Sequence, residues 1–356
     1  MSLARVIPMT NANAALRMTL LGTGTVGSAF VERLAALQGT ALRVPALAAI
    51  ANSRGFVPVD FASQREALDG LRDATGPRDG AWMGDDSFGR GDIVVDATAS
   101  AVVADRHGEW LRRGAHVVTA CKIGQGSDLA RWSGIQSARR AGATHYGDSA
   151  TVGAGLPLLR SIRMLKEGGD RVHAIAGVLS GSLAWLFNHY DGMRPFSGFV
   201  REARDAGYTE PDPRDDLSGE DVRRKILILA RTAGVELESA DVAVQSLVPE
   251  ALAALPVGDV DAALPAMDEP LRQRFADAHR NGEVLKFIAR LENGRARVGL
   301  ESLPSDHPLA GGAGTDNRVA IWSDRYNTQP LVIQGPGAGA EVTAAALLDD
   351  VLAIRG

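Results

Sequence analysis

Apolar residues follow two kinds of pattern along this chain, and the first covers residues 16–147. Short apolar runs, bounded by glycine and polar residues, alternate there with segments of helical period such as the one containing Val26, Phe30 and Leu34. The runs lie within LRMTLLG (16–22), LRVPALAAIANS (42–53), GDIVVDATAS (91–100) and AHVVTACKIG (115–124). Continuous apolar runs of this length are typical of buried parallel strands. The alternation predicts an α/β fold with a doubly wound parallel sheet.

The second pattern begins near residue 170. Strand-like runs at 170–181 and 295–303 enclose longer helical segments, which predicts a second domain of α+β type. The proline-rich stretch 255–270 predicts a connecting loop with a short helix. We expect a dinucleotide-type domain made of residues 16–147 together with 325–356, and a second domain, for substrate binding and dimerisation, made of residues 148–324.

Composition and charge narrow the class of protein. The chain has 356 residues, of which 45% are hydrophobic and 23% charged, and its net charge is −5 with both signs interspersed. This balance gives no electrostatic footprint for nucleic acid or for an anionic membrane surface. No apolar run reaches the roughly 20 residues of a membrane-spanning helix, and the first residues do not resemble a signal peptide. A lone cysteine, Cys121, fits a reducing compartment, so we expect a cytoplasmic protein without nucleic-acid or membrane partners.

A glycine motif follows the first apolar run directly and opens a helical segment. In the G-x-G-x-x-G pattern, the first glycine permits a tight turn, the second lets a pyrophosphate approach the backbone, and the third lets helix and strand pack closely. The helix N-terminus then faces the anion. The motif in this context predicts a Rossmann-type domain that binds a dinucleotide through Gly22, Gly24, Thr25, Val26 and Gly27.

The end of the second apolar run bears on which dinucleotide binds. NAD sites usually carry an Asp or Glu there for the ribose hydroxyls, whereas this run ends in Asn52, Ser53 and Arg54. An arginine beside small polar groups suits a 2′-phosphate, so we expect NADP to be preferred over NAD through Asn52 and Arg54. The alternative is that Arg54 is an ordinary loop arginine.

Two further run ends carry polar residues to the edge of the sheet where ligands bind in this fold. Thr98 and Ser100 follow the run at 91–97, and Lys122 follows Cys121 at the end of the next run. We expect Thr98, Ser100 and Lys122 to face the coenzyme. Each has a structural alternative, since Ser100 also suits a helix N-cap and Lys122 suits a solvated surface lysine.

The most highly charged segment is AGYTEPDPRDDLSGEDVRRK (206–225). Asp221 and Lys225 are four residues apart at the start of an apolar helical stripe, so they share one face of that helix. One interpretation is a site that grips a charged metabolite. The other is a helix start capped by Ser218 with Asp221 at its third position, where Asp221–Lys225 is a simple ion pair.

Taken together, these motifs resemble those of homoserine dehydrogenases, most closely the dehydrogenase part of the bifunctional aspartokinase–homoserine dehydrogenases. The matching segments are GTGTVGSAF (22–30), VVTACK (117–122), ATVGAGLP (150–157), GVLSGSLAWLFN (177–188), GYTEPDPRDDLSGEDVRRK (207–225) and GPGAGAEVTA (335–344). The resemblance covers nearly the whole chain and suggests the short, monofunctional form. It implies NAD(P)-dependent interconversion of L-homoserine and L-aspartate 4-semialdehyde.

The resemblance also implies roles for particular residues. Lys225 and Lys122 would flank the reacting oxygen, with Lys225 as general acid/base and Lys122 as its electrostatic partner. Free lysine titrates at about pH 10.4, and a second cation nearby would lower that value. Substrate contacts are expected at Glu210, Asp216, Asp221 and Gly181, and a further coenzyme contact at Gly337.

A monovalent cation and a homodimer complete what the resemblance implies. The cation, Na⁺ or K⁺, would be held by the backbone carbonyls of Val152, Ala154 and Leu156. The family often adds a carboxylate three residues before that valine, where this chain has Ser149. The homodimer would form through the sheet of the second domain.

Two alternative functions follow from the departures of this chain from the family pattern. Cys121 occupies a position where the family usually has Asn, and a thiolate there could serve a semialdehyde dehydrogenase as nucleophile. A catalytically silent NADP-binding protein is the other alternative. Retention of Lys122, Glu210, Asp221 and Lys225 favours the alcohol dehydrogenase reaction over both.

Overall fold

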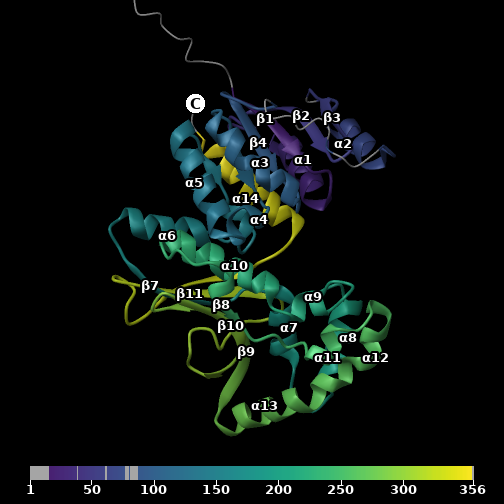
Figure 1. Ribbon diagram of the computed structural model, residues 1–356, viewed down its shortest axis with the longest axis vertical. Coiled ribbons are helices and arrows are strands. Elements are labelled where there is room, and N and C mark those ends of the chain that lie inside the picture. Colours follow the sequence, from purple (N-terminus) through teal and green to yellow (C-terminus); the bar gives the residue numbers. More distant parts are fainter. Residues whose placement is uncertain (1–15, 38, 61, 77–79, 81–86, 355–356) are drawn as a thin grey trace, which may run out of the picture.

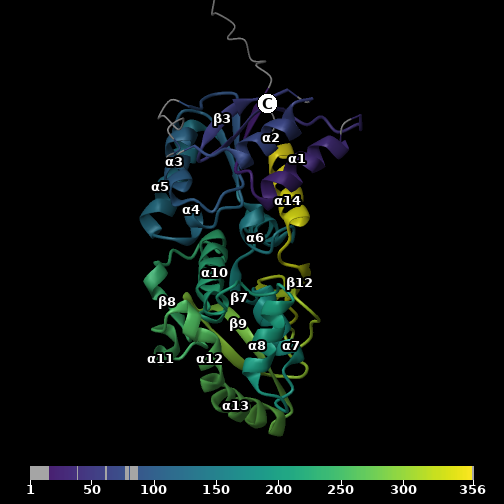
Figure 2. The ribbon, with the colours of Figure 1, turned by 90° about the vertical axis from the view of Figure 1, so that its right-hand side faces the viewer.

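The computed structural model describes residues 16–37, 39–60, 62–76, 80 and 87–354. These residues form two lobes arranged one above the other, each built on its own sheet (Figures 1 and 2). None of the helices in the described ranges is long and apolar enough to cross a membrane.

The upper lobe contains the predicted α/β sheet. Its strands, in spatial order, are β3 (Gly55–Pro58), β2 (Ala46–Asn52), β1 (Arg17–Leu21), β4 (Asp92–Asp96), β5 (His116–Thr119) and β6 (Tyr146–Gly147). The pairs from β2 to β6 are parallel, as predicted. At the edge, β3 is antiparallel to β2, so the predicted parallel sheet carries one antiparallel edge strand. The reason is local: β2 and β3 are joined by a tight turn at residues 53–54, and a tight turn joins only antiparallel strands.

Helices cover both faces of this sheet, which makes it doubly wound. On one face α1 (Thr25–Leu37) and α14 (Ala340–Leu352) share an apolar core with alternate strand residues such as Leu20 and Val95. On the other face α3 (Ala101–Arg112) and α5 (Leu129–Gly142) pack on the intervening residues, including Val94. Consecutive residues of a strand point to opposite faces, so a continuous apolar run is what a sheet covered on both sides requires.

The lower lobe is built on a second, mainly antiparallel sheet. Its strands, in spatial order, are β12 (Leu331–Pro336), β11 (Asp316–Ser323), β7 (Val172–Val178), β9 (Glu283–Glu292), β10 (Arg295–Pro304) and β8 (Val242–Val244). Of these neighbours, β10 and β8 are parallel and the other pairs are antiparallel. The largest apolar core lies between one face of this sheet and the helices that pack on it, with Ile226 and Val319 among its members.

The C-terminal segment divides between the two lobes. We expected residues 325–356 to belong to the dinucleotide domain, but β12 pairs with β11 in the lower sheet, and α14 is the described element that returns to the upper lobe (Figure 1). The sequence of a short strand does not show which strand it pairs with, and β12 pairs with β11, which precedes it in the lower sheet.

The remaining helices connect and cover these sheets. They are α2 (Gln64–Asp73), α4 (Ile123–Gly126), α6 (Leu158–Glu167), α7 (Gly181–His189), α8 (Phe196–Asp205), α9 (Arg214–Leu217), α10 (Glu220–Ala233), α11 (Glu250–Ala253), α12 (Val260–Ala263) and α13 (Asp268–Arg280), with 3-10 turns at Ser149–Thr151, Ser239–Asp241, Val257–Asp259 and Leu264–Met267. The short turns between residues 257 and 267 agree with the loop and short helix predicted for 255–270.

Helix α10 lies where the two lobes meet (Figure 1). Its lower face contributes Val222, Ile226 and Leu229 to the core of the lower lobe, as the apolar stripe predicted. Its other side touches α4 of the upper lobe, where a Cβ on Gly126 would lie 3.2 Å from the Cβ of Arg224. Residues at the start of α10 are therefore placed beside the strand ends of the upper sheet.

Candidate active site

The glycine turn between β1 and α1 has the geometry that dinucleotide binding requires. Gly22 has φ +107°, and a Cβ there would lie 2.9 Å from the carbonyl oxygen of Ala97. A Cβ on Gly27 would lie 2.0 Å from the carbonyl oxygen of Gly22, so both positions demand glycine. A Cβ on Gly24 would meet nothing within 4 Å, which leaves open space at the turn for a pyrophosphate.

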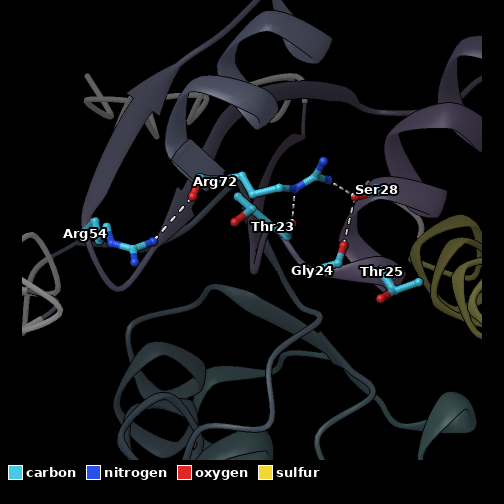
Figure 3. Close-up of a pocket in the computed structure, with 6 residues that line it drawn as sticks. All are labelled: Thr23, Gly24, Thr25, Ser28, Arg54 and Arg72. Atoms are coloured by element: carbon cyan, nitrogen blue, oxygen red, sulfur yellow. Dashed lines mark hydrogen bonds between the residues drawn. The ribbon is translucent and has the colours of Figure 1, made fainter. Parts of the chain in front are cut away.

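A cavity of about 620 Å³ adjoins this turn (Figure 3). It is lined by Thr23, Gly24, Thr25, Ser28, Arg54 and Arg72. Arg72, in the last turn of α2, donates hydrogen bonds to Ser28 Oγ and to the Thr23 carbonyl (3.3 Å), so its guanidinium is held against the glycine turn. Arg54 NH1 lies 3.5 Å from the Arg72 carbonyl, and its Nε has no hydrogen-bond partner among the described residues. The cavity thus presents two cations to an anionic ligand.

Of the other residues expected around the coenzyme, Asn52 and Val26 support the turn, and Thr25 faces the cavity. Asn52 is structural: its side chain donates to Thr23 Oγ1 (3.1 Å) and the Leu71 carbonyl (2.7 Å), and accepts from the Arg54 amide (2.8 Å). Val26 packs partly buried against the core of the upper lobe. Thr25 lines the cavity. Sequence reasoning missed Arg72, because a cation placed in the following helix has no fixed spacing from the glycine motif.

A buried carboxylate organises the ends of β4 and β5. Asp96 is fully buried, and one of its oxygens accepts from the amide (2.9 Å) and hydroxyl (2.6 Å) of Thr98. Its other oxygen accepts from Thr119 Oγ1 (2.9 Å) and lies 3.1 Å from His107 Nε2. Thr119 Oγ1 in turn accepts from the Cys121 amide (2.9 Å). The network joins the loop after β4 to the loop that carries Lys122, and it was not predicted from the sequence.

Ser100 and Cys121 have clear structural roles at this edge. Ser100 is the N-cap of α3, accepting from the Val103 amide at 3.4 Å, which agrees with the capping alternative. Cys121 is 2% exposed, and burial together with the nearby Asp96 raises the pKa of its thiol to about 11. A nucleophilic cysteine needs a lowered pKa and access, so the geometry argues against the semialdehyde dehydrogenase alternative.

Two lysines from different lobes meet on one carboxylate. Asp221 Oδ2 lies 2.6 Å from Lys225 Nζ, four residues along α10. Asp221 Oδ1 lies 3.4 Å from Nζ of Lys122, which follows β5 and is the N-cap of α4. Desolvation would raise the pKa of Asp221, but Lys225 and then Lys122 outweigh it and lower that pKa to about 2. Lys225 Nζ also donates to the Leu179 carbonyl at 2.7 Å. The carboxylate therefore holds two ammonium groups side by side at the junction of the lobes.

The start of α10 differs from the capping alternative. Its N-cap is Gly219, with φ +79° and no side-chain cap, whereas Ser218 ends α9 and accepts from the Glu220 amide at 3.3 Å. Ser218 as N-cap was therefore wrong. A Cβ on Gly219 would lie 3.0 Å from the Phe287 ring, so the sharp turn between α9 and α10 needs glycine.

The other acids of the charged segment separate into structural and site residues. Asp216 accepts from Ser182 Oγ (2.6 Å) on α7 and from the Glu210 amide (2.8 Å), so it joins the start of α7 to the loop that carries Glu210. Asp212, in contrast, pairs with Arg214 at 2.6 Å, and Arg214 donates to the carbonyls of residues 252, 253 and 255. Asp216 therefore lies against the backbone of Glu210, while the Asp212–Arg214 pair supports the neighbouring loop.

The two glycines expected near the ligands lie at crowded positions. Gly181 begins α7, where a Cβ would lie 3.2 Å from the Thr315 carbonyl oxygen. Gly337 follows β12, where a Cβ would lie 2.0 Å from Cγ of Asn317. Both glycines allow close approach of separate segments around the end of β7.

The corner expected to hold a monovalent cation has an unusual backbone. Gly153 and Ala154 both have positive φ (75° and 50°). Among the described residues no hydrogen bond ends on the carbonyls of Val152 and Ala154, while the Leu156 carbonyl accepts from the Leu158 amide at 2.8 Å. Hard carbonyl oxygens of this kind fit Na⁺ or K⁺.

Side chains near that corner are already engaged. Ser149 Oγ donates to Asp350 (2.8 Å), and the buried Asp148 pairs with Arg163 (2.5 Å). Burial raises the pKa of Asp148, opposed by Arg163. Within the described ranges no group of three or more His, Cys, Asp or Glu could hold a metal ion. A cation at the corner would therefore depend on backbone oxygens.

A dinucleotide-type lobe, joined to a second lobe that brings Lys225 beside Lys122 at its sheet edge, defines the class of NAD(P)-dependent dehydrogenases. Comparison with known families agrees: the homoserine dehydrogenase NAD-binding domain matches residues 22–146, and the homoserine dehydrogenase family matches residues 157–352. The chain belongs to the homoserine dehydrogenase family.

Individual relatives fit this assignment. The chain is 37% identical to the homoserine dehydrogenase of Saccharomyces cerevisiae over 95% of its own length and 98% of the yeast protein. It is 46% identical over 73% of its length to a bifunctional aspartokinase/homoserine dehydrogenase 2 of Zea mays, of which it spans 29%. A crystal structure of a putative homoserine dehydrogenase from Archaeoglobus fulgidus superposes with a TM-score of 0.78 at 26% identity, covering 95% of this chain and 98% of that one.

Proposed function

We propose that this protein interconverts L-homoserine and L-aspartate 4-semialdehyde with a nicotinamide coenzyme. The observation that carries the proposal is the meeting of Lys225 and Lys122 on Asp221 at the edge of the upper sheet. Two cations at one point suit an oxygen that gains negative charge during the reaction. Membership of the homoserine dehydrogenase family supports the choice of substrate.

The proton transfer is assigned to Lys225. Two of its three N–H bonds are directed at Asp221 and the Leu179 carbonyl, which leaves one position for the reacting oxygen. When bound, the coenzyme would supply the hydride-transfer chemistry at the substrate carbon. In the oxidation direction, neutral Lys225 takes the hydroxyl proton; in the reduction direction, its ammonium form gives that proton to the aldehyde oxygen. Lys122 stabilises the negative charge that develops on the substrate oxygen in both directions of the reaction.

The amino-acid end of the substrate is assigned to the acids on the lower lobe. Glu210 and Asp216 supply negative charge for the ammonium group, and Asp216 is fixed by Ser182 and by the Glu210 amide. Gly181 lets the Thr315 backbone pack closely against the start of α7, beside Ser182. Asp221 is engaged by both lysines, so we assign it to orienting them rather than to the substrate.

The reaction is tested directly by following coenzyme reduction with L-homoserine at alkaline pH. Turnover with L-homoserine, and not with L-serine or L-threonine, is the expected result. If the purified protein binds NADPH but turns over none of these hydroxy amino acids, the proposed reaction is wrong and a silent coenzyme-binding protein is favoured.

We further propose a preference for NADP over NAD, carried by the pair Arg54 and Arg72. Their guanidinium groups line the cavity beside the glycine turn, where a 2′-phosphate would meet two cations (Figure 3). Charge-assisted hydrogen bonds are worth about 1.5–3 kcal/mol, so Arg72→Ala should raise the KM for NADP by roughly 10- to 100-fold. The KM for NAD should change little. Equal effects on both coenzymes would show that Arg72 holds the turn rather than the phosphate.

A monovalent cation at the 152–156 corner is proposed on the carbonyls of Val152, Ala154 and Leu156. It would supply no chemistry to the reacting atoms and would brace the turn between the lobes. Thermal unfolding in KCl or NaCl, compared with choline chloride at equal ionic strength, tests this. A higher Tm in the metal salts supports the site, and identical Tm values in all three salts contradict it.

A homodimer through the lower sheet is also proposed. The face of this sheet opposite α10 carries a second apolar cluster, and Val284, Trp322 and Val332 remain partly exposed at its margin. Light scattering on the purified protein should give the mass of two chains, and Trp322→Glu should shift it toward one chain. A single-chain mass for the unaltered protein would refute the dimer.

A further inference from the structure

Asn317 is a buried polar residue that the assigned chemistry does not use. It lies near the start of β11, is 1% exposed, and its side-chain oxygen Oδ1 has no hydrogen-bond partner among the described residues. Buried polar atoms are nearly always hydrogen-bonded, and an unmet one lowers stability. An atom of this kind therefore points to a ligand.

The amide orientation of Asn317 is settled by its neighbour. Nδ2 lies 3.4 Å from the Leu179 carbonyl oxygen and donates to it. The reverse orientation would place two acceptors against each other, so Oδ1 must be the atom left without a partner.

The same carbonyl connects Asn317 to the reaction centre. Leu179 O accepts from Lys225 Nζ at 2.7 Å as well as from Asn317 Nδ2. Asn317 shares its side of the lower sheet with Val319 and Ile321, which pack beneath α10. Its amide is therefore a direct neighbour of the proposed acid/base.

Gly337 shows that this arrangement is built into the fold. A Cβ at residue 337 would lie 2.0 Å from Cγ, 2.2 Å from Nδ2 and 2.3 Å from Oδ1 of Asn317. Every other residue type would displace the amide, so the glycine after β12 lets two distant strands meet around it.

We propose that Asn317 is a ligand-binding and positioning residue: Oδ1 accepts an N–H hydrogen bond from a bound ligand, while Nδ2 holds the Leu179 carbonyl that orients Lys225. Two ligands of the proposed reaction offer such a donor, namely the carboxamide of the coenzyme and the ammonium of the amino acid. This inference rests on the proposed function, because that function supplies both ligands.

The test uses the full-length protein and the variants Asn317→Ala and Asn317→Asp. Alanine withdraws the acceptor and cannot collide with Gly337. Aspartate keeps an oxygen at the Oδ1 position but replaces the Nδ2 donor to the Leu179 carbonyl with a second oxygen, so it should restore ligand binding while kcat falls. NADPH affinity is measured by fluorescence titration, which needs no turnover, and the KM for L-homoserine is measured separately. If the wild-type protein turns over no homoserine, the proposed function is wrong. The role of Asn317 is judged separately, from the difference in NADPH affinity and in KM between the variants and the wild type.

We expect Asn317→Ala to weaken one ligand about tenfold and Asn317→Asp to restore it to within about threefold of wild type. A raised NADPH Kd identifies the carboxamide as donor, and wild type should then bind the acetylpyridine analogue, which lacks that N–H, about tenfold more weakly than NADPH. A raised KM for homoserine with unchanged Kd identifies the ammonium. If both constants stay within twofold of wild type in Asn317→Ala, the proposal is overturned. Should alanine prevent folding, Asn317→Leu, which has nearly the shape of asparagine and no acceptor, makes the same comparison.

Discussion

Replacement of Lys225 by methionine separates chemistry from stability at this site. Methionine has nearly the volume of lysine and no charge, so it fills the same space at the start of α10. Lys225 is 9% exposed, with its ammonium 2.6 Å from Asp221 and 2.7 Å from the Leu179 carbonyl. After the change, Asp221 still has Lys122 at 3.4 Å and Leu179 still has Asn317.

The expected magnitudes differ widely. Asp221 is 44% exposed, so its ion pair contributes about 1 kcal/mol or less to stability, and removing a buried ammonium offsets part of that loss. General acid–base catalysis contributes about 10²- to 10⁴-fold, which corresponds to roughly 3–5 kcal/mol in the activation barrier. We therefore expect kcat to fall by roughly two to four orders of magnitude, the full contribution of acid–base catalysis, while the melting temperature changes little.

The assay combines homoserine oxidation with NADPH fluorescence titration and thermal unfolding. The matched control is Lys286→Met, because Lys286 is also buried (6% exposed) and bonds Asn188 on the opposite face of the lower sheet. The control should keep wild-type kcat, and both variants should bind NADPH with wild-type affinity. A kcat for Lys225→Met within tenfold of wild type would refute the assignment of Lys225 as acid/base.

Three further changes probe the surroundings of the site. Cys121→Ser should keep kcat within about threefold of the wild-type value. Iodoacetamide at pH 8 should leave the unaltered enzyme active, because a thiol with a pKa of about 11 is protonated at that pH. Rapid inactivation by iodoacetamide would instead support Cys121 as a nucleophile. Asp96→Asn should lower the free energy of unfolding by about 1–3 kcal/mol, since an amide cannot accept at both oxygens from Thr98 and Thr119, and an unchanged denaturation midpoint would count against the network. The pKa of Asp221 is lowered to about 2 from an ordinary value of about 3.9, so its stabilising contribution is present above about pH 4 and is lost as pH falls toward 2. The difference in melting temperature between wild type and Asp221→Asn should accordingly shrink from pH 7 to pH 3, and a constant difference would contradict this linkage.

The charged segment 207–225 shows how far sequence reasoning reached. It predicted a site there and placed Asp221 and Lys225 on one helix face, which the 2.6 Å contact confirms. It could not separate Asp216, which holds the loop of Glu210, from Asp212, which pairs with Arg214 to support a neighbouring loop. Carboxylates in a short polar stretch look alike in sequence. They are told apart by partners from other segments: Ser182 donates to Asp216, while Arg214, the partner of Asp212, bonds the carbonyls of residues 252, 253 and 255.

Local chemistry was determined by the sequence alone. Apolar runs predicted the strands of the upper sheet, and the glycine pattern predicted a turn whose crowding by backbone atoms demands glycine at Gly22 and Gly27. Such features depend on neighbours within a few residues, so their residue types carry the information.

Long-range pairing was decided by the tertiary structure. It placed β12 in the lower sheet, brought Lys122 of the upper lobe to Asp221 of α10, set Arg72 against the glycine turn, and left Asn317 beside Lys225. Each of these contacts joins segments far apart in the chain, and each depends on how two sheets and a helix pack together. The residues next to a side chain in the sequence do not determine these long-range contacts.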